Sequence, residues 1–205
     1  MHSQQTTNSM KKPTFHRPRR GFTLIELLVV IAIISVLAGA GFAAGAAALN
    51  RARKVTAQAA AIAVEKAVNS FYSEYGTLPI PAGGGRQIDT ASDVDFLRVL
   101  LGDEPEGANM LNPRGIKFLT VKEGKTRGAE GGTDGLVYSG NTVRGMFDPW
   151  GNGYTVVLDT EFENRLTFQT PDGRSQTLNG RRVAVFSPGV PDGENVTGAT
   201  LVKTW

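Results

Sequence analysis

The sequence predicts an α+β protein in which one long N-terminal helix packs on a small antiparallel β-sheet. Residues 22–49 are apolar apart from a single charged residue, Glu26. An amphipathic helical pattern continues to about Tyr75, and beyond residue 115 apolar residues alternate with period two between turn residues. These observations predict a polar leader over residues 1–21, a transmembrane helix over 22–49, an amphipathic helical spine over 50–76 and a globular domain over 77–205.

The apolar stretch can cross a membrane, because a helix rises about 1.5 Å per residue and the hydrocarbon core is about 30 Å thick. A secretory signal peptide would have a shorter apolar region followed by a small-residue cleavage site. Basic residues before the stretch outnumber those just after it by five to three, which favours a cytoplasmic leader. They are Lys11, Lys12, Arg17, Arg19 and Arg20 before it, and Arg51, Arg53 and Lys54 after it.

Glu26 is unusual in this setting, because a carboxylate inside a membrane segment costs about 2.5–3.5 kcal/mol on insertion scales. One interpretation is that Glu26 reaches the headgroups or becomes protonated and has no further role. The other is that it has a positive partner that forms only after processing. Cleavage between Gly21 and Phe22 would create an α-amino group one helical turn from Glu26. The residues alone leave both interpretations open.

Residues 20–30, with the sequence RGFTLIELLVV, resemble the cleavage and methylation motif of type IV prepilins and of the pseudopilins of type II secretion systems. The resemblance implies a pilin-like fold. It also implies that a membrane-embedded prepilin peptidase cuts after Gly21 and N-methylates Phe22. Glu26 is then expected to pair with the Phe22 amine of a neighbouring subunit in a filament. Such a pair is stronger in low dielectric than in water and would favour one axial register.

The predicted spine has an apolar stripe at three- and four-residue spacing, as expected for a helix with one face on a core. Its members are Val64, Ala67, Val68, Phe71 and Tyr75. Gly76 suits the residue that follows a helix, and Pro79 and Pro81 prevent its continuation. The helix is therefore expected to run from about Phe22 to Tyr75.

The globular domain is predicted to contain a short helix that is capped by Ser92 or Thr90 and ended by Gly102, with Val94, Leu97, Leu100 and Leu101 on one face. Period-two alternation predicts strands at 116–121, 136–138, 154–158, 166–168 and 183–186. Turns are expected at Gly131-Gly132, Asn152-Gly153, Pro171-Asp172-Gly173 and Asn179-Gly180. The resulting antiparallel sheet can place one face against the spine.

Residues 148–154, with the sequence DPWGNGY, resemble a signature of the major (G-type) pseudopilins of type II secretion. Asp148 can cap its own turn, Pro149 fixes φ, and Trp150 can anchor the hairpin to the core, with Gly151 completing the turn. These residues are expected to have a structural role. The motif lies far from the N-terminal one and favours a pseudopilin over other pilin-like proteins.

Residues 187–195 and Trp205 resemble the loop and terminal tryptophan with which the same pseudopilins bind a structural calcium ion. Ca²⁺ takes six to eight oxygen ligands, and side chains in this loop offer some of them. The candidates are Ser187, Asp192, Glu194 and Asn195. The family usually has an aspartate four residues before the final tryptophan, whereas this chain has Leu201. A calcium site and a calcium-free loop closed by hydrogen bonds and Trp205 packing both remain open, and no other cofactor is expected.

Charge and residue counts argue against nucleic-acid binding and catalysis. The formal charge of +3 comes from the leader, because without its five basic residues the chain has 17 basic against 19 acidic residues, about −2. The sequence has no cysteine, and both histidines, His2 and His16, lie in the leader. The mature chain therefore lacks the usual nucleophile pairs and zinc ligands. The carboxylates of Asp159 and Glu161 are expected to keep a strand edge soluble.

The expected function is that of a pilin-like structural subunit, not an enzyme. It would be held in the bacterial inner membrane with its globular domain in the periplasm, and then assemble into a type II secretion pseudopilus. Expected partners are copies of itself, minor pseudopilins, the prepilin peptidase, the inner-membrane assembly platform and membrane lipid. The alternatives are a type IV pilus subunit for adhesion, motility or DNA uptake, and a monomeric membrane-anchored binding module.

Overall fold

The computed structural model describes residues 21–81, 84–107, 109–128, 131–191 and 193–205, and it divides the chain into two compact units, Met1–Ala46 and Ala47–Trp205. The long predicted helix is α1, Leu24–Tyr75. By length and composition, α1 is apolar and long enough to cross a membrane. It begins two residues later than predicted. At its other end, Gly76 has φ +69° and donates its N–H to the Tyr72 carbonyl at 2.8 Å, as a helix-terminating glycine does.

Within the second unit, α1 is the spine of the domain. Residues at four- and three-residue spacing along it are completely buried, namely Ala57, Ala61, Val64, Val68 and Phe71. The first two are small, so neighbouring segments can approach the helix closely there, whereas Phe71 fills the wider space near its end. Tyr75 is half-buried and donates its hydroxyl to Asn112 Oδ1 at 2.7 Å, which fixes the loop after α2.

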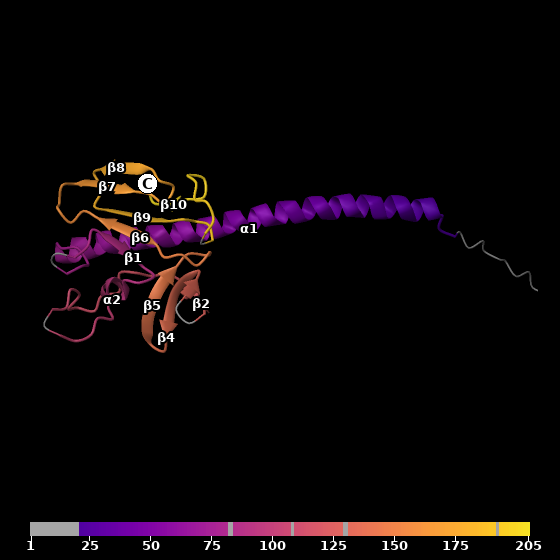
Figure 1. The fold of residues 1–205 in the computed structure, drawn as a ribbon. Coiled ribbons are helices and arrows are strands. Elements are labelled where there is room, and N and C mark those ends of the chain that lie inside the picture. Colours follow the sequence, from indigo (N-terminus) through magenta and orange to yellow (C-terminus); the bar gives the residue numbers. More distant parts are fainter. Residues whose placement is uncertain (1–20, 82–83, 108, 129–130, 192) are drawn as a thin grey trace, which may run out of the picture. The chain divides into compact units, whose positions relative to one another are not determined.

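The main sheet has four antiparallel strands in the order β1, β6, β9, β10 (Figure 1). Their bounds are Gln87–Asp89, Thr155–Leu158, Val183–Ser187 and Val202–Lys203. Three two-stranded antiparallel pairs surround it. They are β2 (Lys125–Arg127) with β3 (Gly131–Thr133), β4 (Gly135–Ser139) with β5 (Thr142–Phe147), and β7 (Arg165–Gln169) with β8 (Ser175–Asn179). The α+β class predicted from the sequence is confirmed.

The main sheet is buried on both faces. Alternate residues of β9 point to opposite sides, so Val183 and Val185 join the core that contains the spine, whereas Ala184 and Phe186 join a second apolar cluster. That second cluster also contains Leu166 and Phe168 of β7, with Leu201 and Trp205 from the end of the sequence. The β7–β8 hairpin therefore covers the face of the sheet that the spine does not.

Two predictions in the globular domain are wrong because tertiary contacts override the local pattern. Residues 116–121 form no strand, since the N–H groups of Phe118 and Leu119 donate to the Leu100 carbonyl at the end of α2 (Val94–Leu101). Gly131 and Gly132 do not form a turn but lie in β3. A Cβ on Gly132 would overlap the side chains of Val137 and Phe147, so glycine is required by close packing.

The predicted cap of α2 is also wrong, whereas its end at Gly102, with φ +71°, is confirmed. Asp93 occupies the N-cap position, and its carboxylate accepts the Asp89 N–H at 2.8 Å instead of a helix N–H. Thr90 is fully buried, where its hydroxyl donates to the Met146 carbonyl at 2.8 Å. It therefore links β1 to β5 and does not cap the helix.

Asp159 does not lie on a soluble strand edge as predicted. It follows β6 and is 4% exposed. Its carboxylate accepts the backbone N–H groups of Glu163 at 3.2 Å and Asn164 at 2.7 Å. Asp159 thus closes the turn between β6 and β7, and only Glu161 remains exposed to solvent as expected.

Candidate functional site

The candidate processing site lies at the start of α1, where Thr23 and Glu26 form a reciprocal capping box. The Thr23 backbone N–H and hydroxyl both donate to Glu26 Oε2, at 2.9 and 2.8 Å. In return, the Glu26 N–H donates to the Thr23 hydroxyl oxygen at 3.2 Å. Because Thr23 is the cap, helical geometry begins at Leu24. The sequence signal for this role is the Thr-x-x-Glu spacing, which the prediction of a helix from Phe22 overlooked.

The peptide bond between Gly21 and Phe22 lies outside the helix. Both residues are exposed, with 78% of Phe22 accessible, and neither has helical structure. A peptidase must bind its substrate in an open backbone conformation, and α1 begins only after this bond. The structure therefore brings an accessible Gly21–Phe22 bond and the Glu26 carboxylate to the same end of one apolar helix.

The second candidate group is centred on Asp148, which is completely buried after β5. Its Oδ1 accepts the backbone N–H groups of Trp150, Gly151 and Asn152, at 2.8, 2.8 and 2.9 Å. Gly151 has φ +103°, a conformation that favours glycine. Asp148 therefore holds its own turn closed with three backbone donors, which leaves Oδ2 for contacts with other segments.

The Oδ2 atom of Asp148 joins this turn to the end of β9. It accepts Nδ2 of Asn152 at 3.0 Å and the Ser187 hydroxyl in a short hydrogen bond. Asn152 Nδ2 also donates to the Val190 carbonyl at 2.7 Å. Segments about 40 residues apart are therefore fixed together by one buried carboxylate. The sequence indicated the turn, but nothing in the local pattern indicated Ser187 and Val190 as its partners.

Other residues of the DPWGNGY motif support the main core. Trp150 and Pro149 are half-buried, and Trp150 packs against the core that contains the spine. Burial raises the pKa of the Tyr154 phenol, and the nearby carboxylates of Asp148 and Asp134 raise it further. Tyr154 therefore stays neutral at physiological pH.

The proposed calcium ligands fit a shared ion site poorly. Ser187 is buried and its hydroxyl already donates to Asp148, whereas Glu194 and Asn195 are exposed in the loop that follows β9. Asp192 lies outside the described residues. Leu201 is 4% exposed and belongs to the second apolar cluster, where a carboxylate would lose its hydration. Calcium binding stays a prediction from resemblance, with these contacts against it.

Trp205 closes the second apolar cluster. Its ring meets Phe168 and Phe186 edge-on, with centroids 5.3 and 6.0 Å apart, and those two phenylalanines stack at 5.5 Å. Leu201 and Phe186 are buried in the same cluster. The segment that follows β9 is thus held by aromatic packing as well as by Asp148.

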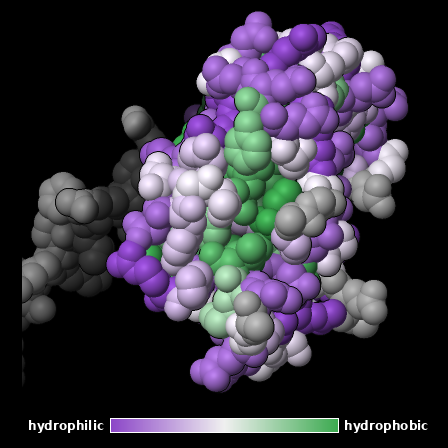
Figure 2. All heavy atoms as spheres, turned by 90° about the vertical axis from the view of Figure 1, so that its left-hand side faces the viewer, coloured by the Kyte–Doolittle hydropathy of each residue, from purple (hydrophilic) through white to green (hydrophobic). Residues whose placement is uncertain are grey.

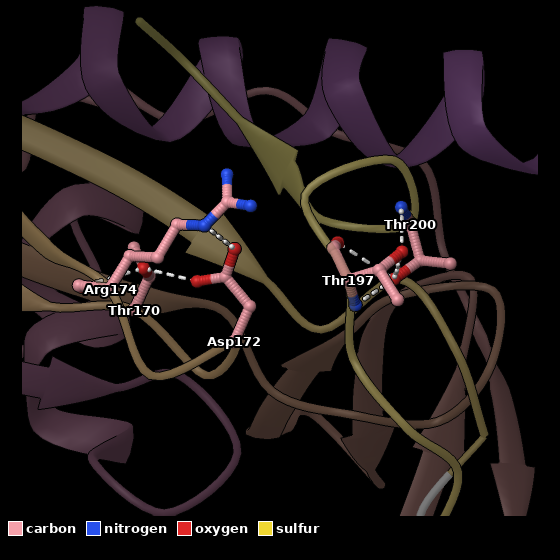
Figure 3. A network of polar contacts seen from close by, with 5 residues as sticks. All are labelled: Thr170, Asp172, Arg174, Thr197 and Thr200. Carbon is pink, nitrogen blue, oxygen red and sulfur yellow. Dashed lines mark hydrogen bonds and ion pairs between the residues drawn. The ribbon is translucent and has the colours of Figure 1, made fainter.

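A polar cluster lies beside the same segment (Figure 3). In the turn of the β7–β8 hairpin, the Thr170 hydroxyl donates to Asp172 Oδ1 at 2.5 Å, and Arg174 Nε lies 3.6 Å from Asp172 Oδ2. The Thr170 hydrogen bond lowers the pKa of Asp172 most, and Arg174 lowers it further, while burial opposes both. A Cβ on Gly198 would lie 3.2 Å from Arg174 Nη1, so this cluster packs closely on the 197–200 loop.

The expectation that the chain is not an enzyme remains a prediction. A cavity of about 740 Å³ lies beside α2, and its lining includes Asp93, Asp95, Arg98 and Glu104. Glu104 accepts the backbone N–H groups of Leu111 and Asn112 at 3.0 and 2.6 Å and so has a structural partner.

Figure 2 shows a hydrophobic area framed by hydrophilic residues on the end of the domain at the left of Figure 1.

Comparison with known families supports the processing site. The sequence model of the prokaryotic N-terminal methylation motif matches residues 16–42, which include Gly21, Phe22 and Glu26. The match supports a type IV pilin-like protein that is a substrate of a prepilin peptidase. Searches of curated proteins and of solved structures each found no match.

Replacing Asp148 with alanine is expected to destabilise the domain by about 2–4 kcal/mol, because three backbone N–H groups of half-buried residues and the buried Ser187 hydroxyl would lose their acceptor. The measurement is chemical unfolding of the detergent-solubilised protein. Asp95→Ala is the matched control, since that side chain is 96% exposed. Equal stability of the two variants would contradict the structural role of Asp148.

Calcium is expected to leave the melting temperature unchanged, because Ser187 is already engaged by Asp148 and Leu201 replaces an acidic ligand. The purified protein would be melted in excess Ca²⁺ and again in EGTA. A clear rise in melting temperature with Ca²⁺, lost on mutation of Glu194 to glutamine, would show that the loop binds an ion after all.

The stability contributed by Asp172 is expected to depend on pH. Its folded-state pKa lies below its ordinary value of 3.8, so the contribution is complete above about pH 5 and is lost as pH falls through the lowered folded-state pKa. Unfolding of wild type and Asp172→Asn would be compared from pH 7 to pH 2. The difference in unfolding free energy should shrink in acid; a constant difference would contradict the assignment.

Proposed function

We propose that this chain is a structural subunit of a type II secretion pseudopilus. The observation that carries the proposal is the exposed Gly21–Phe22 bond ahead of an apolar helix whose one early charge, Glu26, lies in a matched methylation motif. Prepilin peptidase removes the leader after Gly21 and N-methylates Phe22. The mature subunit is anchored in the inner membrane by residues 22–49, with its globular domain in the periplasm.

Assembly depends on the charge that cleavage creates. The new Phe22 amine and the Glu26 carboxylate of another copy attract one another strongly in a low dielectric, and a charge left alone there is costly. Before assembly, the Thr23 N–H and hydroxyl satisfy Glu26 within its own chain. When a second subunit arrives, Glu26 exchanges its hydrogen bonds to Thr23 for an ion pair with the Phe22 amine of that subunit. This ion pair favours the axial position of the second subunit at which its amine reaches the carboxylate.

The globular domain supports secretion over the two alternatives. The DPWGNGY motif resembles that of major pseudopilins, and here its Asp148 ties two distant segments of the domain together. A type IV pilus subunit would share the processing site, and many such subunits close their last loop with a disulfide, which a chain without cysteine lacks. If the helix only anchored a monomeric binding module in the membrane, the Glu26 carboxylate in the membrane segment would have no role. The proposed partners are minor pseudopilins and the inner-membrane assembly platform.

The decisive measurement is the mass of the mature N-terminus, which is expected to begin with N-methylated Phe22. Glu26→Val should be processed normally but should reduce filament yield at least about tenfold, since the amine would lose its partner. Leu27→Val is the matched control. Retention of the leader in cells that process other prepilins, or normal filaments in Glu26→Val, would overturn the proposal. Loss of secreted enzymes without loss of twitching in a deletion strain would distinguish secretion from a pilus role.

A further inference from the structure

The turn between β6 and β7 presents an aromatic side chain to solvent in a strained conformation. Phe162 has φ +56°, an unfavourable value for a bulky residue, and it is 59% exposed. Asn164 also has a positive φ, +57°. Asp159 holds the turn rigid by accepting the Glu163 and Asn164 N–H groups. The ring lies against Tyr72 of α1, yet more than half of Phe162 stays exposed, so the strained turn holds an aromatic surface where a partner can reach it.

The residues on either side of Phe162 are acidic. Glu161 and Glu163 are exposed, and in the part of the chain that the structure describes their carboxylates form no hydrogen bond or ion pair. Residues 161–163, here called the acidic turn, therefore combine one apolar ring with two free negative charges. A partner surface for this turn needs an apolar recess bordered by cations.

Such a surface exists elsewhere in the same domain. A cavity of about 410 Å³, here called the basic pocket, is bordered by Arg51, Arg53 and Lys54 of the spine, and among the residues that the structure describes Glu194 is the one acidic residue in its lining. Its apolar lining includes Trp150, Val190, Pro191 and Ala199. Lys54 donates to the Ala199 carbonyl, which fixes the loop beside the spine. Arg51 and Arg53 are exposed, and neither forms an ion pair with a described residue.

The two surfaces lie at opposite ends of the spine. Lys54 borders the basic pocket, whereas the Phe162 ring lies 6.3 Å from Tyr72, about 18 residues and about 27 Å further along α1. One copy can therefore use both surfaces at once, each with a different neighbour. When two different surfaces of the same protein bind each other, each added copy is rotated relative to the one before. If these rotations do not close a ring, the copies form a helical filament.

We propose that the acidic turn of one copy docks in the basic pocket of a second copy. Phe162 enters the recess beside Trp150, and Glu161 and Glu163 face Arg51 and Arg53. This inference rests on the proposed filament and names the contact between its globular domains. A phospholipid headgroup would satisfy the arginines, which follow closely on the apolar stretch, but would leave the acidic turn and its exposed ring without a function.

Disulfide crosslinking of full-length protein in cells tests the contact, because the chain has no cysteine of its own. Glu161→Cys combined with Ala199→Cys should give a ladder of linked multimers, whereas neither single variant should. Asn141→Cys with Ala199→Cys is the matched control, since Asn141 is exposed in the turn between β4 and β5, and no ladder is expected. No ladder from the first pair in cells that form Glu26-dependent filaments would overturn the contact and leave the proposed function intact. No ladder and no filaments would overturn both.

Charge exchange separates a protein partner from a lipid. Glu161→Lys with Glu163→Lys should lower filament yield at least about tenfold, because like charges would face each other. Adding Arg51→Glu and Arg53→Glu should restore the yield. If the acid reversal has no effect, or if the arginine changes do not rescue it, the basic pocket binds something other than the acidic turn, such as an anionic headgroup, and the proposal is wrong.

Discussion

The globular domain depends on the packing of one stripe of α1 against the main sheet. From Ala57 to Phe71 the buried residues recur at four- and three-residue spacing, and the strands place alternate side chains against them. The apolar face of the helix and the apolar face of the sheet bury each other in a single core. Loss of the apolar pattern in one element would therefore leave the apolar face of the other exposed. Between Leu27 and Leu49 the same helix carries no charged residue, and its large apolar side chains are exposed, which suits lipid and not a second protein core.

Long and periodic features were predictable from the sequence, whereas features set by distant contacts were not. The helix to Tyr75 and the strands β4, β6, β7 and β9 follow from hydrophobic period and turn residues. Residues 116–121 alternate like a strand, but the N–H groups of Phe118 and Leu119 donate to the Leu100 carbonyl, and no strand within the described residues pairs with this segment. Gly132 reads as a turn residue, yet it lies in a strand because Val137 and Phe147 leave no space for a side chain.

In the candidate sites too, local motifs were predictable from the sequence, whereas contacts between distant segments were not. The proposed cleavage and methylation residues, with Glu26, lie within one local motif, so they could be predicted from the sequence. Asp148 was recognised as a turn cap, but its bond to Ser187 joins segments that no local pattern relates. Ser187 was predicted as a possible calcium ligand from resemblance, and the structure adds that its hydroxyl donates to Asp148. A buried hydroxyl can serve a carboxylate or an ion, and only the fold decides which one lies within reach.

The closure of the last segment around Asp148 and Trp205 has a consequence for biogenesis. Hydrogen bonds and aromatic packing hold this segment, and the sequence has no cysteine that could form a disulfide in it. Its native state can therefore be reached without thiol oxidation, and reducing agents have no bond in it to cleave. Folding of the domain is in this way independent of the oxidoreductases on which disulfide-stabilised subunits rely.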